Sequence, residues 1–381
     1  MNPSHPVVTV IIPAYNAAST LAATLESGQN QTVREIEIIV VDDGSADETV
    51  ALVEATAAKD SRIRLLKQKN AGVGAARNTA IRAAKGEFIA PLDADDLWLP
   101  EKLARQVERM QRGGEGMGMV YCGSQTIGSR GEVLTINPLF DVEGYLRKTL
   151  ILKNIIGGAS VPLFRKSVLQ KIGFYMQRPE QDGAMGCEDW DLSLRVAEVA
   201  SVGAVVEHLV QYRQMDDCMS LNADGMIRSY SAMIRRAKSR NPDLPEELFQ
   251  WSAGQFYNYL ASKQHRWGDH SGYLRCLWHG GRLDPALLLN TRIHKMALKS
   301  LWYLLRSTAS LRSTTPTSRP SGKSTAKPVA SASASASASA SASASASASA
   351  SASPRSRPRG GQWFHRINEN RWHQVRSDPS P

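Results

Sequence analysis

Apolar runs alternate with helical patterns along the N-terminal part of the chain. The apolar runs predict five strands, at residues 7–12, 36–41, 62–66, 88–92 and 119–122, and the first two of them are expected to be buried. Between them, apolar spacing and capping signals predict helices at residues 18–27, 45–58, 74–84 and 100–110. Strands that alternate with helices in this way are typical of a parallel sheet covered by helices. We therefore predict an α/β fold with a mainly parallel sheet flanked by helices.

The pattern changes twice further along the chain. Residues 160–164 and 202–210 resemble further strands, and residues 222–307 read as a series of amphipathic helices. From residue 330 to 353 alanine and serine alternate strictly, and such a segment has no large apolar side chain with which to form a core. We expect four parts, namely an α/β domain at 1–220, a helical extension at 221–310, a disordered Ser/Ala/Pro-rich linker at 311–362 and a short basic aromatic segment at 363–381.

The positive charge of the chain is concentrated in its C-terminal region. The 381 residues carry a formal net charge of +10, and residues 311–381 hold ten lysines and arginines against two acidic residues. The folded part is therefore close to neutral, and the basic composition is weak evidence for nucleic-acid binding. We expect no nucleic-acid partner.

Neither the cysteines nor the apolar segments indicate a special compartment. The four cysteines are far apart and show no zinc-binding or disulfide spacing. We find no signal-peptide pattern, and no apolar stretch approaches the ~20 residues that span a bilayer. We expect a cytoplasmic location, with peripheral contact at the inner face of the membrane as an addition to it.

A tight group of carboxylates follows the fourth expected strand. Asp93, Asp95 and Asp96 come directly after an apolar run, at the edge where open α/β sheets bind ligands. Clustered carboxylates there must be exposed, paired or metal-bound, because buried unpaired charges are costly. Mg²⁺ and Mn²⁺ prefer oxygen ligands and are often held by one or two carboxylates together with substrate phosphates. The group predicts a metal–diphosphate site; the alternative is an acidic turn that caps the next helix.

Two further motifs end the first two strands. Tyr15 in Pro13–Asn16 offers a ring that can stack on a base, or is simply a surface tyrosine in a turn. Asp42 and Asp43 follow the second strand, where one carboxylate can accept from a base N–H and the other can cap a helix. Ser45 and Glu48 have the spacing of a capping box for that helix.

A glycine-containing segment and a second acidic pair complete the candidate chemistry. Residues 70–78 place glycines before a helix whose N–H groups favour anions, and Arg77 can reach a phosphate or a base. Glu188 and Asp189 stand at a helix start about a hundred residues later. A carboxylate there can deprotonate an acceptor hydroxyl, although acidic residues also favour helix N-termini for electrostatic reasons alone.

Taken together, these motifs strongly resemble those of the family 2 glycosyltransferases, which have the GT-A fold. The resemblance lies in the segments VTVIIPAYNAASTLAATLESGQNQT, EIIVVDDGSADET, NAGVGAARNTAI, GEFIAPLDADDLW and CEDWDLSLRVA, in the order and approximate spacing of the family. It covers residues 7–220, and the tail after about residue 307 has no counterpart. One departure is Met215, at a position where the family often has a histidine. We expect no phosphate contact from Met215, and Arg213 is the residue that can take its place.

The resemblance implies an inverting transfer of a sugar from a nucleotide-sugar donor, most often a UDP-sugar, to a hydroxyl acceptor. It implies that Asp93 and Asp95 form the DxD motif, that Asp95 or Asp96 holds a divalent metal (Mn²⁺ or Mg²⁺), and that Asp189 of the Glu188–Asp189 pair is the general base. The residues expected around the donor are Pro13, Ala14, Tyr15, Asp42, Asp43, Arg77, Asp93 and Asp95. Cell-surface polysaccharide or glycoconjugate synthesis is the expected setting, with a saccharide, lipid-linked or protein acceptor.

Two other function classes compete with this expectation. A nucleotidyltransferase can share the sheet and the metal site, but it typically has a Gly-rich, Arg-containing loop where this chain has Pro13–Asn16. A non-catalytic scaffold with a degenerate donor site is opposed by the intact carboxylates. Separately, residues 295–306 combine cations with large apolar residues. That stretch fits either peripheral membrane contact through the C-terminal region or a core helix followed by a solvated tail.

Overall fold

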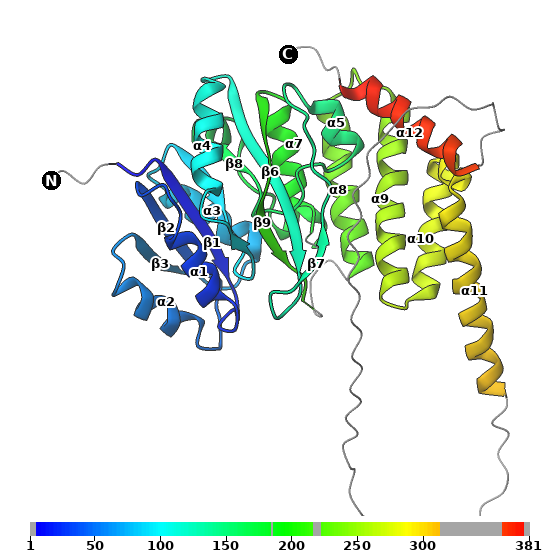
Figure 1. Cartoon of the computed structure of the whole chain (residues 1–381), viewed down its shortest axis with the longest axis horizontal. Coiled ribbons are helices and arrows are strands. Elements are labelled where there is room, and N and C mark those ends of the chain that lie inside the picture. Colours follow the sequence, from blue (N-terminus) through cyan, green and yellow to red (C-terminus); the bar gives the residue numbers. More distant parts are fainter. Residues whose placement is uncertain (1–4, 184–185, 216–221, 313–359, 377–381) are drawn as a thin grey trace, which may run out of the picture.

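One curled sheet is formed by strands between Val8 and Arg213, in the N-terminal part of the molecule (Figure 1). The structure is a computed structural model and describes residues 5–183, 186–215, 222–312 and 360–376. The strands follow the order β3-β2-β1-β4-β8-β6-β9-β5, with β7 beside β6. Their bounds are β1 (Val8–Ala14), β2 (Ile36–Asp42), β3 (Ile63–Lys67), β4 (Phe88–Pro91), β5 (Leu97–Trp98), β6 (Met117–Ile127), β7 (Val133–Ile136), β8 (Leu163–Arg165) and β9 (Ser201–Arg213).

Helices cover the sheet and extend the molecule at its C-terminal end. Every residue of β1 and β2 is buried, so both faces of the sheet are covered there. The helices are α1 (Leu21–Gln29), α2 (Thr49–Ala57), α3 (Val73–Ala83), α4 (Lys102–Arg112), α5 (Arg147–Leu152), α6 (Lys166–Ile172), η1 (Arg178–Gln181), α7 (Glu188–Ala197), α8 (Ala223–Arg240), α9 (Glu246–Arg266), α10 (His270–Leu283), η3 (Pro285–Leu289), α11 (Thr291–Arg312) and α12 (Gly360–Arg376).

The expected α/β architecture is confirmed, and the sheet has two differently built halves. Strands β3, β2, β1 and β4 are all parallel, as the β-α-β pattern predicts. Beyond β4, strand β8 pairs antiparallel with both β4 and β6, while β6 and β9 are parallel to each other. The short β5 pairs antiparallel with the end of β9. This last pairing holds the loop after β4 against the C-terminal end of β9.

The expected capping box before α2 is wrong. The helix begins at Thr49 with Glu48 as its N-cap, and Glu48 makes no side-chain cap bond; the Asp47 carboxylate accepts from the Thr49 N–H at 3.0 Å instead. Ser45 instead accepts a hydrogen bond from the backbone N–H of Asn16, with its Oγ at 2.9 Å. Thus Ser45 ties the loop after β2 to the loop after β1.

The C-terminal helices pack beside the sheet and are joined to it through aromatic side chains. Trp190 of α7 lies against Tyr230 of α8, with ring centroids 5.6 Å apart, and Tyr230 stacks on Phe256 of α9 at 4.0 Å. Helix α12 returns across α9 to the end of the molecule where α5 lies (Figure 1). Within the described residues, no helix is long and apolar enough to cross a membrane.

The division into four parts stays a prediction. Most of the expected linker at 311–362 lies outside the described residues, although α11 continues to Arg312 and α12 already begins at Gly360. The basic aromatic segment forms a helix that docks on the body of the molecule: Val375 is buried in the main core, and the Trp372 ring lies 6.0 Å from that of Phe140.

Candidate functional site

The loops after β1 and β2 lie side by side at the carboxyl edge of the parallel strands. Ala14 is paired in register with Asp42, and the Asp43 N–H donates to the Ala14 carbonyl at 2.8 Å. Asn16 adopts a left-handed backbone with φ of 48°, and its side chain accepts from the Ala46 N–H at 2.8 Å. Pro13 and Ala14 are buried, whereas Tyr15 is 55% exposed. The Tyr15 ring is therefore available to a ligand at this edge.

Asp42 and Asp43 are buried and hold neighbouring loops. The Asp42 carboxylate accepts from the Ser45 N–H at 3.2 Å. The Asp43 carboxylate accepts from Gln68 Nε2 at 2.8 Å and from the backbone N–H groups of Ala71 and Gly72 at 2.9 and 2.8 Å. Asp43 thus fixes the glycine-containing segment that precedes α3. A base contact from Asp43 would have to share these bonds.

Helix α3 makes a close contact with the segment that follows α6. A Cβ on Gly74 would lie 2.3 Å from the Met176 carbonyl oxygen, so only glycine allows this approach. The Asn78 side chain then pairs with the backbone of Tyr175, donating to its carbonyl and accepting from its N–H, both at 2.9 Å. Together these contacts fasten the two halves of the sheet domain to one another.

Arg77 lies between the two acidic motifs. Its guanidinium donates to Asp93 Oδ1 at 2.5 Å and to Glu188 Oε1 at 3.1 Å, and it is buried. The group also lies 5.1 Å from the centre of the Tyr175 ring. Arg77 is therefore close to the predicted diphosphate site. Its N–H groups, however, already donate to Asp93 and Glu188, which are 95 positions apart in the sequence. Arg77 thus brings Asp93 and Glu188, one from each acidic motif, together at a single guanidinium, and this bridge is the central feature of the site.

Asp96 has an environment unlike that of Asp95. Its two carboxylate oxygens accept from Ser160 Oγ at 2.5 Å and from the Arg213 N–H at 2.9 Å, and it is fully buried. Burial, with Asp95 and Asp93 nearby, raises the pKa of the Asp96 carboxyl well above its usual range. Both oxygens are thus already used to join the loop after β4 to the end of β9.

Asp95 is partly buried, and its carboxylate forms no hydrogen bond with other residues of the described ranges. Burial and the adjacent Asp93 charge raise the pKa of Asp95 to about 6. Its backbone carbonyl accepts from Arg213 Nε at 2.8 Å. Arg213 also donates to the carbonyls of Gly128 and Ser129, so its guanidinium supports loops. The Arg213 guanidinium is therefore not free to make the phosphate contact that was expected to compensate for Met215.

Glu188 and Asp189 also differ in their bonding. Glu188 is buried and accepts from Arg77 and from the Gly186 N–H at 2.9 Å. Asp189 is partly buried, and the one hydrogen bond that its carboxylate accepts from the described residues comes from the Trp190 N–H at 2.7 Å. Burial and the Glu188 charge raise the pKa of Asp189 to about 7. Asp189 is the member of the pair suited to exchange protons near neutral pH.

Trp190 fixes the start of the helix that carries this pair. Its indole N–H donates to the Leu150 carbonyl at 2.6 Å, and its ring packs on Tyr230. The position of Asp189 therefore depends on α5 and α8 as well as on α7.

Several residues of this network are not among those expected from the sequence. Ser160 Oγ bonds Asp96 and also accepts from the Asp93 N–H at 2.9 Å, while Asn78 and Tyr175 form the clamp described above. A lone serine has no local signature, because its partners lie more than 60 positions away. Asn78 does lie within the 70–78 segment that the sequence singles out, so that segment was the available signal.

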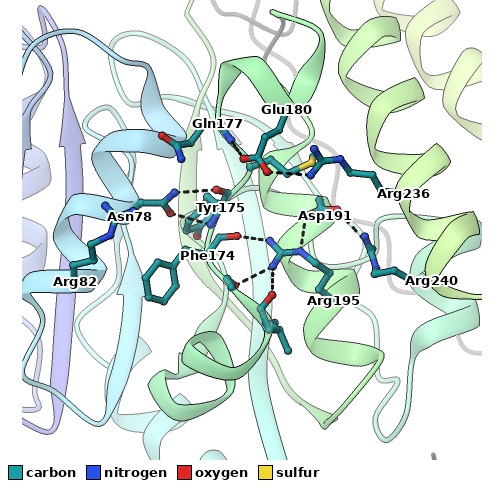
Figure 2. A pocket seen from close by; sticks show the side chains of 13 residues that line it. Asn78, Arg82, Phe174, Tyr175, Gln177, Glu180, Asp191, Arg195, Arg236 and Arg240 are labelled. Carbon is teal, nitrogen blue, oxygen red and sulfur yellow. Dashed lines mark hydrogen bonds and ion pairs between the residues drawn. The ribbon is translucent and has the colours of Figure 1, made fainter.

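A polar pocket lies beside the carboxylates and does not include Asp93, Asp95 or Asp189 (Figure 2). Its volume is about 330 Å³. Asp191 lies in its wall, where Arg195 Nε donates to Asp191 Oδ2 at 2.7 Å and Arg240 approaches the other oxygen at 3.7 Å. Arg195 also donates to the carbonyls of Ile172, Gly173 and Phe174. These contacts in the pocket wall thus hold residues 172–175, which include Tyr175, in place.

The carboxylates fit a metal only if a ligand supplies further oxygens. Within the described part of the chain, no cluster of three or more histidine, cysteine or acidic side chains is arranged to hold an ion. Asp95, with Asp93 beside it, provides the one or two carboxylates that Mg²⁺ commonly takes in addition to substrate phosphates. The donor set is therefore compatible with a metal that binds together with a diphosphate.

Comparison with known proteins points to one family. The model of "Glycosyl transferase family 2" matches residues 9–173. An uncharacterized glycosyltransferase of Rickettsia typhi is 30% identical over 241 residues, which are 61% of this chain and 71% of that protein. The Escherichia coli protein named UDP-Glc:alpha-D-GlcNAc-diphosphoundecaprenol beta-1,3-glucosyltransferase WfaP is 43% identical over 106 residues, which are 28% of this chain and 41% of that protein.

The similarity to the first curated relatives covers only a part of those proteins. The chain spans 19% and 33% of two of them. Among solved structures, S. aureus TarS matches with a TM-score of 0.52 and 18% identity, over 76% of this chain and 50% of that chain. At this level of identity the likeness concerns the fold, which agrees with the curled α/β sheet described above.

Proposed function

Because the chain belongs to glycosyltransferase family 2, we propose that it transfers a sugar from a nucleotide-sugar donor to a hydroxyl acceptor, with inversion at the anomeric carbon. The observation that carries the proposal is the Arg77 bridge, since it holds Asp93 of the DxD motif and Glu188 of the acidic pair at one guanidinium. Donor carboxylates and a base thereby line one site. Cell-surface polysaccharide or glycoconjugate synthesis is the setting that we propose.

The donor that we favour is a UDP-sugar. Exposed Tyr15 provides a face for a base, and the segment held by Asp43 provides backbone N–H groups at the start of α3. WfaP is named as a transferase that uses UDP-Glc, which supports the same nucleotide here. That name also specifies a lipid-linked saccharide, so we favour this class among the three acceptors considered above.

A divalent metal, Mg²⁺ or Mn²⁺, is part of the proposal, with Asp95 as its principal ligand and Asp93 as a second. When bound, such an ion neutralises charge that develops on the leaving nucleoside diphosphate. Asp95 is the better candidate than Asp96, because a ligand at Asp96 would compete with Ser160 and with the Arg213 N–H. Asp96 instead positions the loop that carries Asp95.

Asp189 is proposed as the general base of a single displacement. The acceptor oxygen forms a bond to the anomeric carbon while the bond from that carbon to the diphosphate oxygen breaks. The hydroxyl proton passes to the Asp189 carboxylate, and the nucleoside diphosphate departs with the bonding electron pair. The Asp189 pKa of about 7 keeps a large fraction of the group deprotonated at neutral pH while making it a stronger base than an ordinary carboxylate.

Calorimetry with UDP, dTDP and GDP tests the donor site first. We expect one nucleotide to bind in the presence of Mn²⁺ and to lose most of its affinity in EDTA or in the Asp95→Asn variant. Sugar transfer should then be measured with the corresponding donors for the parent chain and for Asp189→Asn. A folded protein that binds none of the three nucleotides would contradict the proposal and favour a scaffold role. Release of pyrophosphate from a nucleoside triphosphate and a sugar phosphate would instead indicate a nucleotidyltransferase.

A further inference from the structure

Helix α11 has two apolar faces, and in the described part of the chain one of them packs against neighbouring helices while the other is exposed. Ile293 and Ser300 are buried, and Met296 packs against the apolar cluster that the other C-terminal helices form. On the other side, four large residues follow the i, i+3, i+4, i+7 spacing of a helical stripe. They are Leu298, Leu301, Trp302 and Leu305, which are 69%, 48%, 50% and 62% exposed.

A row of cations borders this exposed stripe. Arg292, Lys295, Lys299 and Arg306 recur at helical spacing on one flank, and the whole of α11 contains no aspartate or glutamate. The arginine and lysine side chains also lie near the aromatic rings, with Arg306 4.7 Å from the centre of the Trp302 ring and Lys299 5.9 Å from that of Tyr303. Apolar and cationic groups thus share one side of the helix.

We propose that the exposed stripe of α11, Leu298, Leu301, Trp302 and Leu305, docks on an anionic lipid bilayer. An interfacial helix buries an apolar stripe at the level of the headgroups and places its cations beside lipid phosphates, which is the arrangement found here. The absence of acidic residues from the helix matches a negatively charged surface.

Two other occupants of the exposed stripe fit its residues less well. A second copy of the chain, paired through the same helix, would bring like-charged cation rows toward one another. The segment at 313–359 has Val329 as its one large apolar residue, is rich in lysine and arginine and has no acidic residue, so its composition complements neither the stripe nor the cations. The bilayer is the occupant that satisfies both.

Docking through α11 leaves the donor site open. In Figure 1 this helix, drawn in gold, lies at the end of the molecule farthest from β1, β2 and β3, and its C-terminal end projects beyond α10. The carboxyl ends of β1 and β2 carry Tyr15 and Asp43, so the proposed membrane contact and the proposed nucleotide site do not compete for surface. Membrane binding and sugar transfer can therefore be measured independently.

Vesicle flotation with the full chain tests this inference. We expect the protein to float with vesicles of phosphatidylcholine and phosphatidylglycerol, to stay in the dense fraction with phosphatidylcholine alone, and to be released by salt. The paired change Leu301→Ser and Trp302→Ser should abolish flotation. Lys295→Glu with Lys299→Glu should do the same, whereas both variants should transfer sugar to a soluble acceptor as the parent does.

Matched controls keep the inference separate from general effects of polarity, charge and the basic tail. Leu134→Ser with Ile136→Ser removes two exposed apolar side chains of β7, and Lys59→Glu with Lys85→Glu makes the same charge change elsewhere; both should float like the parent. Flotation that survives the Leu301/Trp302 change would overturn the inference and assign binding to another region. So would a parent that ignores anionic vesicles, or a dimer that this same change dissociates, which would assign the stripe to a second copy.

Discussion

At the scale of single residues, the site depends on unequal environments for neighbouring carboxylates. Among the residues that the structure describes, Glu188 accepts from Arg77 and Gly186, while Asp189 beside it accepts from the Trp190 N–H alone. In the same way Asp96 is fully bonded and Asp95 is not. In each pair one member is bonded into the surrounding loops, and the other is the one to which we assign the proposed chemistry. Sequence adjacency alone could not separate these roles, because the partners that decide them are distant in the chain.

The pH dependence of transfer tests the role of Asp189. Its pKa is raised to about 7, and only the deprotonated carboxylate can accept a proton, so kcat/KM should fall about tenfold per unit as pH drops below 7. Activity should be constant above that point until another group titrates. Asp189→Asn should lose at least about 100-fold in rate, together with this acidic limb. Full activity in Asp189→Asn, or an acidic limb that persists in it, would exclude Asp189 as the base.

Arg77 should matter for stability as well as for transfer. Arg77→Met leaves buried Glu188 without its cation, and breaking a buried ion pair on one side costs roughly 3 kcal/mol or more. Urea unfolding should show this loss in the free energy of unfolding. Adding Glu188→Gln to Arg77→Met should recover part of it, because the stranded charge is then gone. Additive losses in the double variant would show that the two side chains are not coupled.

At the scale of elements, the contact between α3 and residues 173–177 joins two parts of the sheet domain. One part carries the proposed nucleotide site at the ends of β1 and β2, and the other carries Asp189. Gly74→Ala should push α3 away from the Met176 carbonyl, lowering the free energy of unfolding by about 1–3 kcal/mol and reducing kcat/KM. Gly116→Ala is the matched control, since nothing lies within 4 Å of its added Cβ. Circular dichroism melts and transfer rates of both variants would check this. Equal behaviour of the two would mean that the contact yields without cost.

The parallel half of the sheet could be predicted because β1 and β2 are buried apolar runs and a helix follows each of β1, β2 and β3. Strands β5 and β7 could not, because β5 has two residues and β7 is exposed along its length. The antiparallel direction of β8 also has no local signal, since it depends on its pairing with β4 and β6. Motif positions around the site followed from the ends of the predicted strands. The ties made by Asn78 and Ser160 required the three-dimensional contacts.

At the scale of the whole molecule, the C-terminal helix closes the fold after a long intervening segment. Thr149 of α5 donates to the Val375 carbonyl at 3.1 Å, and Gln255 of α9 donates to Asn368 at 3.0 Å. Because α5 also accepts the indole N–H of Trp190, the helix α12 and the start of α7 share a neighbour. The packing that positions Asp189 therefore extends to the end of the chain.

The ion pair between Arg371 and Asp284 should hold α12 in place. Arg371 donates both terminal nitrogens to the carboxylate, at 2.6 and 2.8 Å, and its guanidinium lies 4.5 Å from the centre of the Trp251 ring. Asp284 is 1% exposed, so Arg371→Met would leave a buried charge unpaired at a cost of roughly 3 kcal/mol. Hydrogen exchange of the α12 amides should become much faster, while Gln374→Ala on the exposed side of the same helix should leave it unchanged. If exchange in Arg371→Met matched that of the parent, the ion pair would not be needed to hold α12, and its other contacts, among them Trp372, Val375 and the Gln255–Asn368 hydrogen bond, would suffice.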